Sequence, residues 1–169
     1  MALRPAKCYR KLERPYTRKS RVKKKNYVKS TPPLKIHRFE TGERKDYEKK
    51  LYLIAKRAVQ IRHNALEAMR QAVIKHISKH TKDFFLKVLV YPHHILRENP
   101  LATGAGADRF QTGMRLSFGN PIGVAVQVKQ GQRIMEVNIN NNNLEFAKRA
   151  LKIASMKSPT PCRIEIVDK

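Results

Sequence analysis

Two pairs of histidines have the residue type and spacing that could support chemistry. His76 and His80 lie four positions apart, the spacing at which two imidazoles on one face of a helix can bind zinc. The glutamate that a metalloprotease helix carries directly after its first histidine is absent, and no third ligand is evident, so two ordinary helical histidines are the favoured interpretation. His93 and His94 follow a proline. One of these imidazoles could pack against the protein while the other meets a phosphate, and a plain turn pair is the alternative.

The remaining polar residues indicate no catalytic site. The 13 acidic residues form no pair suited to general acid–base work, and Asp108 has no base near it in sequence. Cys8 and Cys162 are far apart and form no CxxC motif, which predicts two free thiols. Phosphate-loop and GxSxG motifs are absent as well. We therefore predict a protein that is not an enzyme, with no cofactor, no metal and no small-molecule substrate.

The net charge of the chain indicates a polyanionic partner instead. Its 169 residues include 37 lysines and arginines against 13 acids, for a net charge of +24. A compact protein with that charge repels itself unless a polyanion is bound. No run of 18 apolar residues exists, so no membrane partner is expected. Because zinc-finger and basic-zipper patterns are also absent, RNA is favoured over DNA.

Much of this charge lies in residues 1–30, which show no apolar periodicity. This segment holds twelve lysines and arginines and one acid, Glu13, so it carries +11 of the net charge. Such a segment cannot bury enough surface to order itself, and we expect a bound partner to order it. Tyr9, Tyr16 and Tyr27 are interleaved with the cations and could stack on bases. The predicted RNA contacts of this extension and of the later histidine region are Arg4, Lys7, Arg10, Lys11, Arg14, Tyr16, Arg18, Lys19, Arg21, Lys23, Lys24, Lys25, His93, His94 and Arg97.

A second unusual segment is NPLATGAGADRFQT, residues 99–112, which lacks periodicity over a length that is long for a connection. Glycine and alanine dominate it, and Arg97, Arg109 and Arg115 flank or interrupt it. Small residues let a backbone approach another surface closely, which suits insertion into a crowded RNA cavity. An ordinary mobile surface loop fits the composition equally well. A lid of an RNA-modifying enzyme is a further alternative.

The rest of the chain, residues 31–169, predicts a single globular domain that includes the loop 99–114. Alternating apolar residues predict strands within 51–61, 84–91, 122–128, 135–139 and 164–166, of which 122–128 and 135–139 would form an antiparallel hairpin. Helical spacing predicts one helix over 64–80, opened by a capping box of Asn64 and Glu67, and a second from Asn142–Asn143 to just before Pro159. The predicted fold is an α+β two-layer sandwich, with two main helices packed on a mostly antiparallel sheet.

Several stretches of the sequence resemble one family over essentially the whole chain. These stretches are RPAKCYR (4–10), RPYTRKS (14–20), ALEAMR (65–70), YPHHILRENPLATGAGADRFQTGMR (91–115) and FGNPIGVAVQV (118–128). The block AGADRFQTGMR (105–115) is the most specific. The chain resembles the large-subunit ribosomal proteins of the universal L-sixteen family, in their archaeal and eukaryotic L-ten-e type. Because eukaryotic members continue beyond the position of Lys169, the archaeal form is expected.

The resemblance also implies a cellular location, binding partners and a role for the long loop. It implies a cytoplasmic, ribosome-bound structural constituent that binds large-subunit rRNA between the central protuberance and the stalk base, near 5S rRNA and neighbouring ribosomal proteins. It also implies that a long loop supports aminoacyl-tRNA positioning near the peptidyl transferase centre. In this sequence the loop comprises Leu101, Ala102, Thr103, Gly104, Ala105, Gly106, Ala107, Asp108, Arg109, Phe110, Gln111, Thr112, Gly113 and Met114. An RNA-modifying enzyme or an RNA-binding assembly factor is the alternative function.

Overall fold

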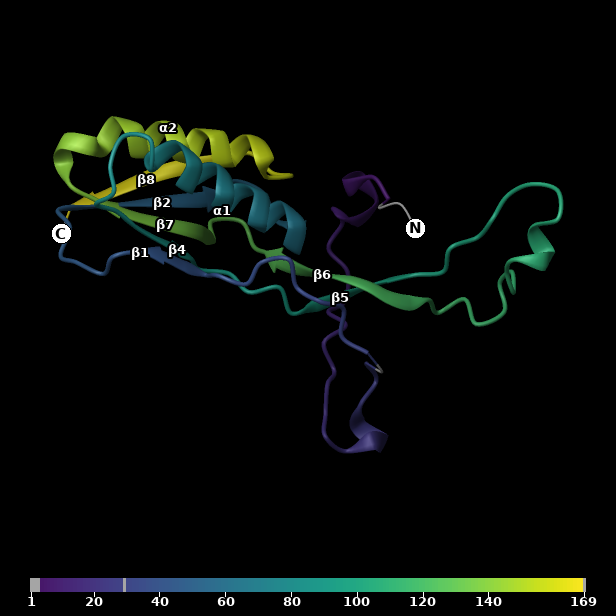
Figure 1. Cartoon of the computed structure of the whole chain (residues 1–169). Coiled ribbons are helices and arrows are strands. Elements are labelled where there is room, and N and C mark those ends of the chain that lie inside the picture. Colours follow the sequence, from purple (N-terminus) through teal and green to yellow (C-terminus); the bar gives the residue numbers. More distant parts are fainter. Residues whose placement is uncertain (1–3, 29, 169) are drawn as a thin grey trace.

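A computed structural model of the chain describes residues 4–28 and 30–168. Residues 1–3 and 29 of the basic extension, and residue 169, lie outside the described residues. The larger part of the fold is a five-stranded sheet in which all neighbouring strands run antiparallel. In order across the sheet, its strands are β1 (Glu40–Gly42), β4 (Phe85–Val88), β7 (Arg133–Ile139), β2 (Lys49–Ala55) and β8 (Cys162–Asp168). Helices α1 (His63–Ile77) and α2 (Leu144–Lys157) lie side by side over one face of this sheet (Figure 1). The predicted α+β class is confirmed.

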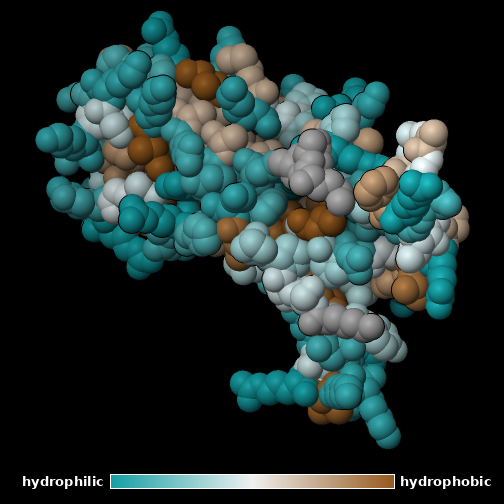
Figure 2. Space-filling model, turned by 45° about the vertical axis from the view of Figure 1, so that its right-hand side comes forward, coloured by the Kyte–Doolittle hydropathy of each residue, from teal (hydrophilic) through white to brown (hydrophobic). Residues whose placement is uncertain are grey.

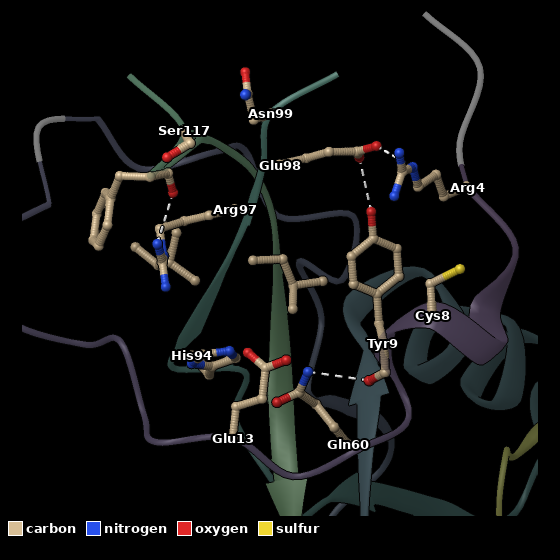
Figure 3. Close-up of a pocket in the computed structure, with 13 residues that line it drawn as sticks. Arg4, Cys8, Tyr9, Glu13, Gln60, His94, Arg97, Glu98, Asn99 and Ser117 are labelled. Atoms are coloured by element: carbon tan, nitrogen blue, oxygen red, sulfur yellow. Dashed lines mark hydrogen bonds and ion pairs between the residues drawn. The ribbon is translucent and has the colours of Figure 1, made fainter. Parts of the chain in front are cut away.

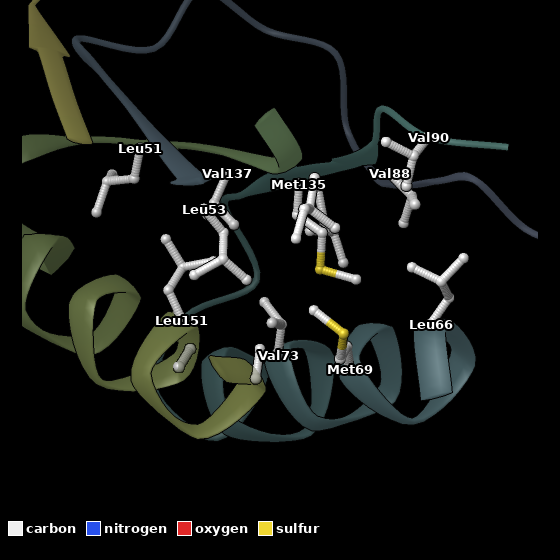
Figure 4. Close-up of a cluster of buried hydrophobic side chains, with 14 of the residues drawn as sticks. Leu51, Leu53, Leu66, Met69, Val73, Val88, Val90, Met135, Val137 and Leu151 are labelled. Atoms are coloured by element: carbon white, nitrogen blue, oxygen red, sulfur yellow. The ribbon is translucent and has the colours of Figure 1, made fainter. Parts of the chain in front are cut away.

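The main hydrophobic core lies between this sheet and the two helices (Figure 4). Alternate residues of the central strands point into it, so Leu53 of β2 and Val137 of β7 are fully buried. The buried residues of α1 recur every three or four positions, from Leu66 to Ile77, as a helix with one apolar face requires. The buried face of α2 is mostly alanine, apart from Leu151. Small side chains there let the two helices approach each other closely.

A second sheet contains only three strands, β3 (Val59–Arg62), β6 (Asn120–Val128) and β5 (His94–Glu98), with β6 in the middle. The strand pairing shows that the predicted hairpin of 122–128 and 135–139 is wrong. β6 pairs with β3 and β5, whereas β7 pairs with β4 and β2, so the two consecutive strands belong to different sheets. Period-two alternation identifies a strand and its buried face, but it carries no information about which strand lies alongside.

Other element boundaries also differ from the predictions. The strand expected over 51–61 is two strands, β2 and β3, and the break contains Arg57, the residue that interrupts the alternation. The prediction of a capping box at the start of α1 is wrong. The helix begins at His63, and the Asn64 side chain accepts a hydrogen bond from the backbone N–H of the next residue. The side chain of Glu67 pairs with Arg70 instead. Helix α1 ends at Ile77, three residues earlier than expected.

Two segments project from the region of the small sheet (Figure 1). One is part of the N-terminal extension, and it ends in a 3-10 turn at Lys23–Lys25. The other is the connection between β5 and β6, residues 99–119, which contains a 3-10 turn at Ala107–Arg109. The five-stranded sheet and its helices lie away from both projections. The small sheet therefore positions both segments that the sequence analysis singled out.

Candidate RNA interface

Hydrogen bonds fasten the N-terminal extension to the small sheet. The backbone N–H of Tyr16 donates to Nδ1 of His94 at 2.8 Å, and the N–H of Ile95 donates back to the Tyr16 carbonyl at 3.0 Å. Nearer the N-terminus, the backbone N–H of Gln60 donates to the carbonyl of Arg10 at 3.1 Å. These contacts join the extension to β5 and β3. Intramolecular partners thus hold a segment that the sequence analysis expected only a bound partner to order.

The three tyrosines of the extension differ in their contacts within the protein and in how much of each ring is exposed. The hydroxyl of Tyr9 donates to Glu98 at 2.8 Å, and burial together with that carboxylate raises the pKa of Tyr9 to about 12. Tyr16 is half-buried and its hydroxyl donates to the backbone carbonyl of Tyr27. Tyr27 is 56% exposed, with the guanidinium of Arg18 4.6 Å from its ring centre. Of the three rings that were expected to stack on bases, only Tyr27 has a largely free surface, because Tyr9 and Tyr16 serve internal contacts.

The adjacent histidines at the start of β5 have opposite surroundings. The side chain of His94 is only 5% exposed, and burial lowers its pKa below the ordinary value of 6.5. Its Nδ1 accepts a hydrogen bond, so the imidazole is neutral and occupied. The His94 ring, which the sequence predicted to contact RNA, is packed inside the protein and holds the extension. His93 is exposed, with its ring 4.6 Å from that of Tyr91.

Arg97, on β5, joins the extension to the end of the long connection. Its guanidinium lies 3.8 Å from the ring centre of Phe118 and 4.8 Å from that of Tyr16, and it donates to the Phe118 carbonyl at 2.7 Å. Arg97 lines a cavity of about 300 Å³ whose polar wall includes the ion pair of Arg4 with Glu98 (Figure 3). Neighbours within the chain thus occupy the guanidinium groups of Arg4 and Arg97, and the carboxylate of Glu98 offsets the charge of Arg4.

Most of the cationic side chains of the extension that were predicted to bind RNA form no such contacts within the described chain. Within residues 4–28 and 30–168, no ion pair and no side-chain hydrogen bond involves nine of these exposed side chains: Lys7, Arg10, Lys11, Arg14, Lys19, Arg21, Lys23, Lys24 and Lys25. The backbone N–H groups of Tyr27 and Val28 donate to the Arg18 carbonyl, which closes residues 18–28 into a hairpin-like projection. Hydrophilic side chains spread outward from this lower projection in Figure 2. The arrangement presents a cluster of ammonium and guanidinium groups to a polyanion.

Two side chains hold the connection between β5 and β6, residues 99–119, at its neck. Asn99 donates to the Gly113 carbonyl at 3.2 Å, and Gln111 bonds to Ala102. The amide of Gln111 accepts a hydrogen bond from the Ala102 N–H at 2.6 Å and donates to the Ala102 carbonyl at 3.0 Å.

Apolar side chains on both sides of this neck are unusually open to solvent. Phe110 is 87% exposed and Leu116 is 83% exposed. Phe110 and Gln111 belong to the predicted loop, whereas Leu116 was not predicted as part of it. The sequence carried no signal for the hydrogen bonds of Gln111, and the only signal for Leu116 was an apolar residue without periodicity.

The other histidine pair does not form a metal site in the described residues. The ring of His80 stacks on Phe146 at 4.1 Å, with its plane tilted by only 7°, and lies 5.5 Å from the ring of His76. Across residues 4–28 and 30–168, no three His, Cys, Asp or Glu side chains gather closely enough to hold a metal ion. Within the same residues, no helix has both the length and the apolar character to cross a membrane.

The fold and its two projections define a class. A compact α+β body carries a cationic extension and a long connection on one small sheet, the arrangement of a protein that binds a polyanion such as RNA. The chain belongs to the ribosomal protein L16p/L10e family, whose profile matches residues 13–165. It is therefore a structural constituent of the large ribosomal subunit, bound to ribosomes in the cytoplasm, and not an enzyme.

Curated relatives agree along the whole length. The large ribosomal subunit protein uL16 of Caldivirga maquilingensis is 46% identical over 176 residues, covering 100% of this chain and 97% of the relative. The uL16 proteins of Archaeoglobus fulgidus and Saccharolobus solfataricus are 45% and 48% identical, covering 100% and 99% of this chain and 95% and 94% of the relatives. All three relatives are archaeal, in agreement with the expected type.

Proposed function

We propose that the chain binds large-subunit rRNA through the exposed cations of residues 4–28 and through His93. The proposed location is between the central protuberance and the stalk base, near 5S rRNA and neighbouring ribosomal proteins. The observation that carries this proposal is the separation of roles in the extension. Its backbone and the Tyr9 and Tyr16 rings bind the small sheet, while nine of its cations point to solvent without partners in the described chain. A polyanion can then bind without first breaking contacts of the protein.

Phosphate neutralisation would supply most of the affinity. Each phosphate contacted by Lys or Arg releases condensed counterions, so binding weakens steeply with salt. If the extension contacts about six to ten phosphates, affinity falls by about 10³–10⁵ between about 50 and 200 mM salt. Sequence contributes little, because the major groove of an RNA helix is too narrow for side chains to read. The extension is therefore proposed to recognise the shape and charge of folded rRNA.

The second part of the proposal concerns loop 99–114. The hydrogen bonds between Gln111 and Ala102 hold the two ends of this loop together. The loop also exposes apolar and small residues, which suit contact with RNA surfaces away from the body of the protein. We propose that it supports the positioning of aminoacyl-tRNA near the peptidyl transferase centre. Peptide-bond chemistry would belong to the RNA. The relatives are subunit constituents by name, which favours this role over that of an assembly factor.

Crosslinking tests both parts. Ultraviolet irradiation of ribosomes that contain the native chain, followed by sequencing of the attached RNA, should give large-subunit rRNA on peptides of residues 4–28. Peptides of residues 99–114 should carry tRNA when aminoacyl-tRNA is bound. Recovery of the chain on pre-ribosomal particles alone, and its absence from translating ribosomes, would favour the assembly-factor alternative.

A further inference from the structure

Three aromatic rings form a row on the surface where the two sheets meet. Phe39 packs on the main core and stacks on Tyr91, with ring centres 5.2 Å apart and planes 25° apart. The next ring is His93, 4.6 Å from Tyr91. Tyr91 is 45% exposed and His93 is exposed. The row is therefore anchored in the core at one end. At the other end Tyr91 and His93, whose planes are 47° apart, present ring surface to solvent.

A cavity of about 310 Å³ adjoins this row. Tyr91 and His93 line it on one side, and Pro15 and Thr17 of the extension also contribute. Two glutamines, Gln127 of β6 and Gln132 of the turn after it, belong to the same lining. The cavity is thus built from the extension, the β4–β5 link and the β6–β7 turn, segments that are far apart in sequence.

The two glutamines retain one hydrogen-bonding group each. The amide nitrogen of Gln127 donates to the carbonyl of Glu13 and to the side chain of Gln60, which leaves its oxygen as an acceptor. The amide oxygen of Gln132 accepts from the backbone N–H of Lys129, which leaves its nitrogen as a donor. An acceptor and a donor beside an aromatic surface are the groups that recognise the edge of a nucleobase. Arg14, exposed and without an ion-pair partner in the described chain, adjoins Pro15 and could hold the neighbouring phosphate.

From this combination we infer that the cavity is a nucleobase-binding site. An unpaired base of an RNA strand stacks on the Tyr91–His93 surface, and its edge meets the free groups of Gln127 and Gln132. Stacking tolerates any base, because every base has a π-face, whereas the glutamines select among base edges. The inference rests on the proposed binding of RNA. It adds a site for one unstacked base to an interface that would otherwise read only charge and shape.

The test uses the purified full chain and a single-stranded RNA of about 12 nucleotides, within the site sizes of single-strand binders. Every adenine is replaced by 2-aminopurine, whose fluorescence falls when it stacks on an aromatic ring. Wild type should bind and quench the probe. Tyr91→Leu and His93→Ala should each weaken binding by at least about fivefold and reduce the quenching. Tyr52→Leu, which removes a part-exposed tyrosine of β2 outside both the cavity and the extension, is the matched control and should keep the quenching.

The outcomes separate the two proposals. If Tyr91→Leu and His93→Ala quench and bind as wild type does, the nucleobase site is wrong even though salt-dependent RNA binding persists. If wild type binds the probe without quenching it, the site is equally wrong. If wild type shows no salt-dependent binding at all, the RNA interface of the extension fails as well. Thermal unfolding of each variant identifies a loss of fold, and the exposed His93 gives a readout should Tyr91→Leu unfold.

Discussion

The backbone N–H of Tyr16 donates a 2.8 Å hydrogen bond to Nδ1 of His94, 78 positions later in the chain. A second imidazole accepts a backbone hydrogen bond in the same way: the N–H of Lys35 donates to Nδ1 of His63 at 3.0 Å. Two histidines of the folded body thus hold the N-terminal segment that leads into it. Each can accept only while its Nδ1 carries no proton, so the attachment of this segment depends on pH.

Lowering the pH should loosen this attachment. Burial lowers the pKa of both His94 and His63 below the ordinary 6.5. Their contribution to the free energy of unfolding is therefore complete above the pKa of the unfolded imidazole, and it is lost as the pH falls through the lower pKa of the folded state. Hydrogen exchange at the Tyr16 and Lys35 amides, corrected for its intrinsic pH dependence, should quicken between about pH 7 and pH 5. His94→Asn offers an acceptor that does not titrate, so exchange at Tyr16 should lose this pH dependence. Equal protection of Tyr16 in wild type at both pH values would contradict the mechanism.

Removing the lysines at the tip of the projection should weaken RNA binding without affecting the fold. The triple variant Lys23→Ala, Lys24→Ala, Lys25→Ala changes exposed side chains only. The slope of log affinity against log salt should fall by up to about 3, since each phosphate contact contributes about 0.9. Binding of rRNA fragments across a salt series, with thermal unfolding alongside, measures both effects. Lys45→Ala is the control, because Glu43 and Asp83 already neutralise that ammonium, and its slope should stay near wild type. An unchanged slope in the triple variant would remove the tip from the interface.

Shortening the long connection should affect translation rather than folding. Residues 102–110 comprise Ala102 of the neck and the segment beyond it, and they contain no residue of the hydrophobic core. Their deletion should leave unfolding and incorporation into ribosomes unchanged, but slow tRNA accommodation or peptide synthesis measured with purified ribosomes. Gln111→Ala should act in the same direction more weakly, since it removes two hydrogen bonds of about 1 kcal/mol each at the neck. Gln130→Ala, in the exposed turn before β7, is the matched control. Normal accommodation by ribosomes with the shortened loop would show that the loop assignment is wrong.

The face of α2 that packs on the core should dominate the stability of that helix. Leu151 is fully buried and Met156, on the same helix, is 71% exposed. Leu151→Ala should lower the free energy of unfolding by about 2–5 kcal/mol through lost burial and a remaining cavity. Met156→Ala should change it by no more than about 0.5 kcal/mol. Urea unfolding of the two variants gives both values, and similar losses in the two would contradict the packing described.

A glycine at the end of the long connection should be irreplaceable. Gly119 has φ of +83°, and a Cβ built on it would lie 2.8 Å from the carbonyl carbon of Glu98. Gly131 has a similar φ of +76° but open space around it. Gly131→Ala should therefore cost only the conformational strain, about 1–2 kcal/mol. Gly119→Ala should cost clearly more, because the strands β5 and β6 must also separate. Denaturant unfolding compares the two variants, and equal losses would mean that the close approach to Glu98 does not matter.

Local sequence patterns determined much of this protein. The apolar spacing from Leu66 to Ile77 predicted α1, because a helix that covers a sheet must be apolar on one face. The charge density of residues 1–30 predicted a polyanionic partner, since a free chain would repel itself. The absence of periodicity over residues 99–112 correctly separated a long connection from the strands around it. Each of these inferences depends only on residues close together in the chain.

Tertiary structure alone decided how distant segments combine. The consecutive strands β6 and β7 belong to different sheets, although their alternation matches that of a hairpin. Nothing near Tyr16 indicates that it binds His94, and nothing near Tyr91 indicates that Gln127 of β6 and Gln132 of the following turn complete a cavity beside it. The physical reason is that apolar periodicity specifies which face of an element is buried. Which element covers that face is settled by the packing of the whole chain.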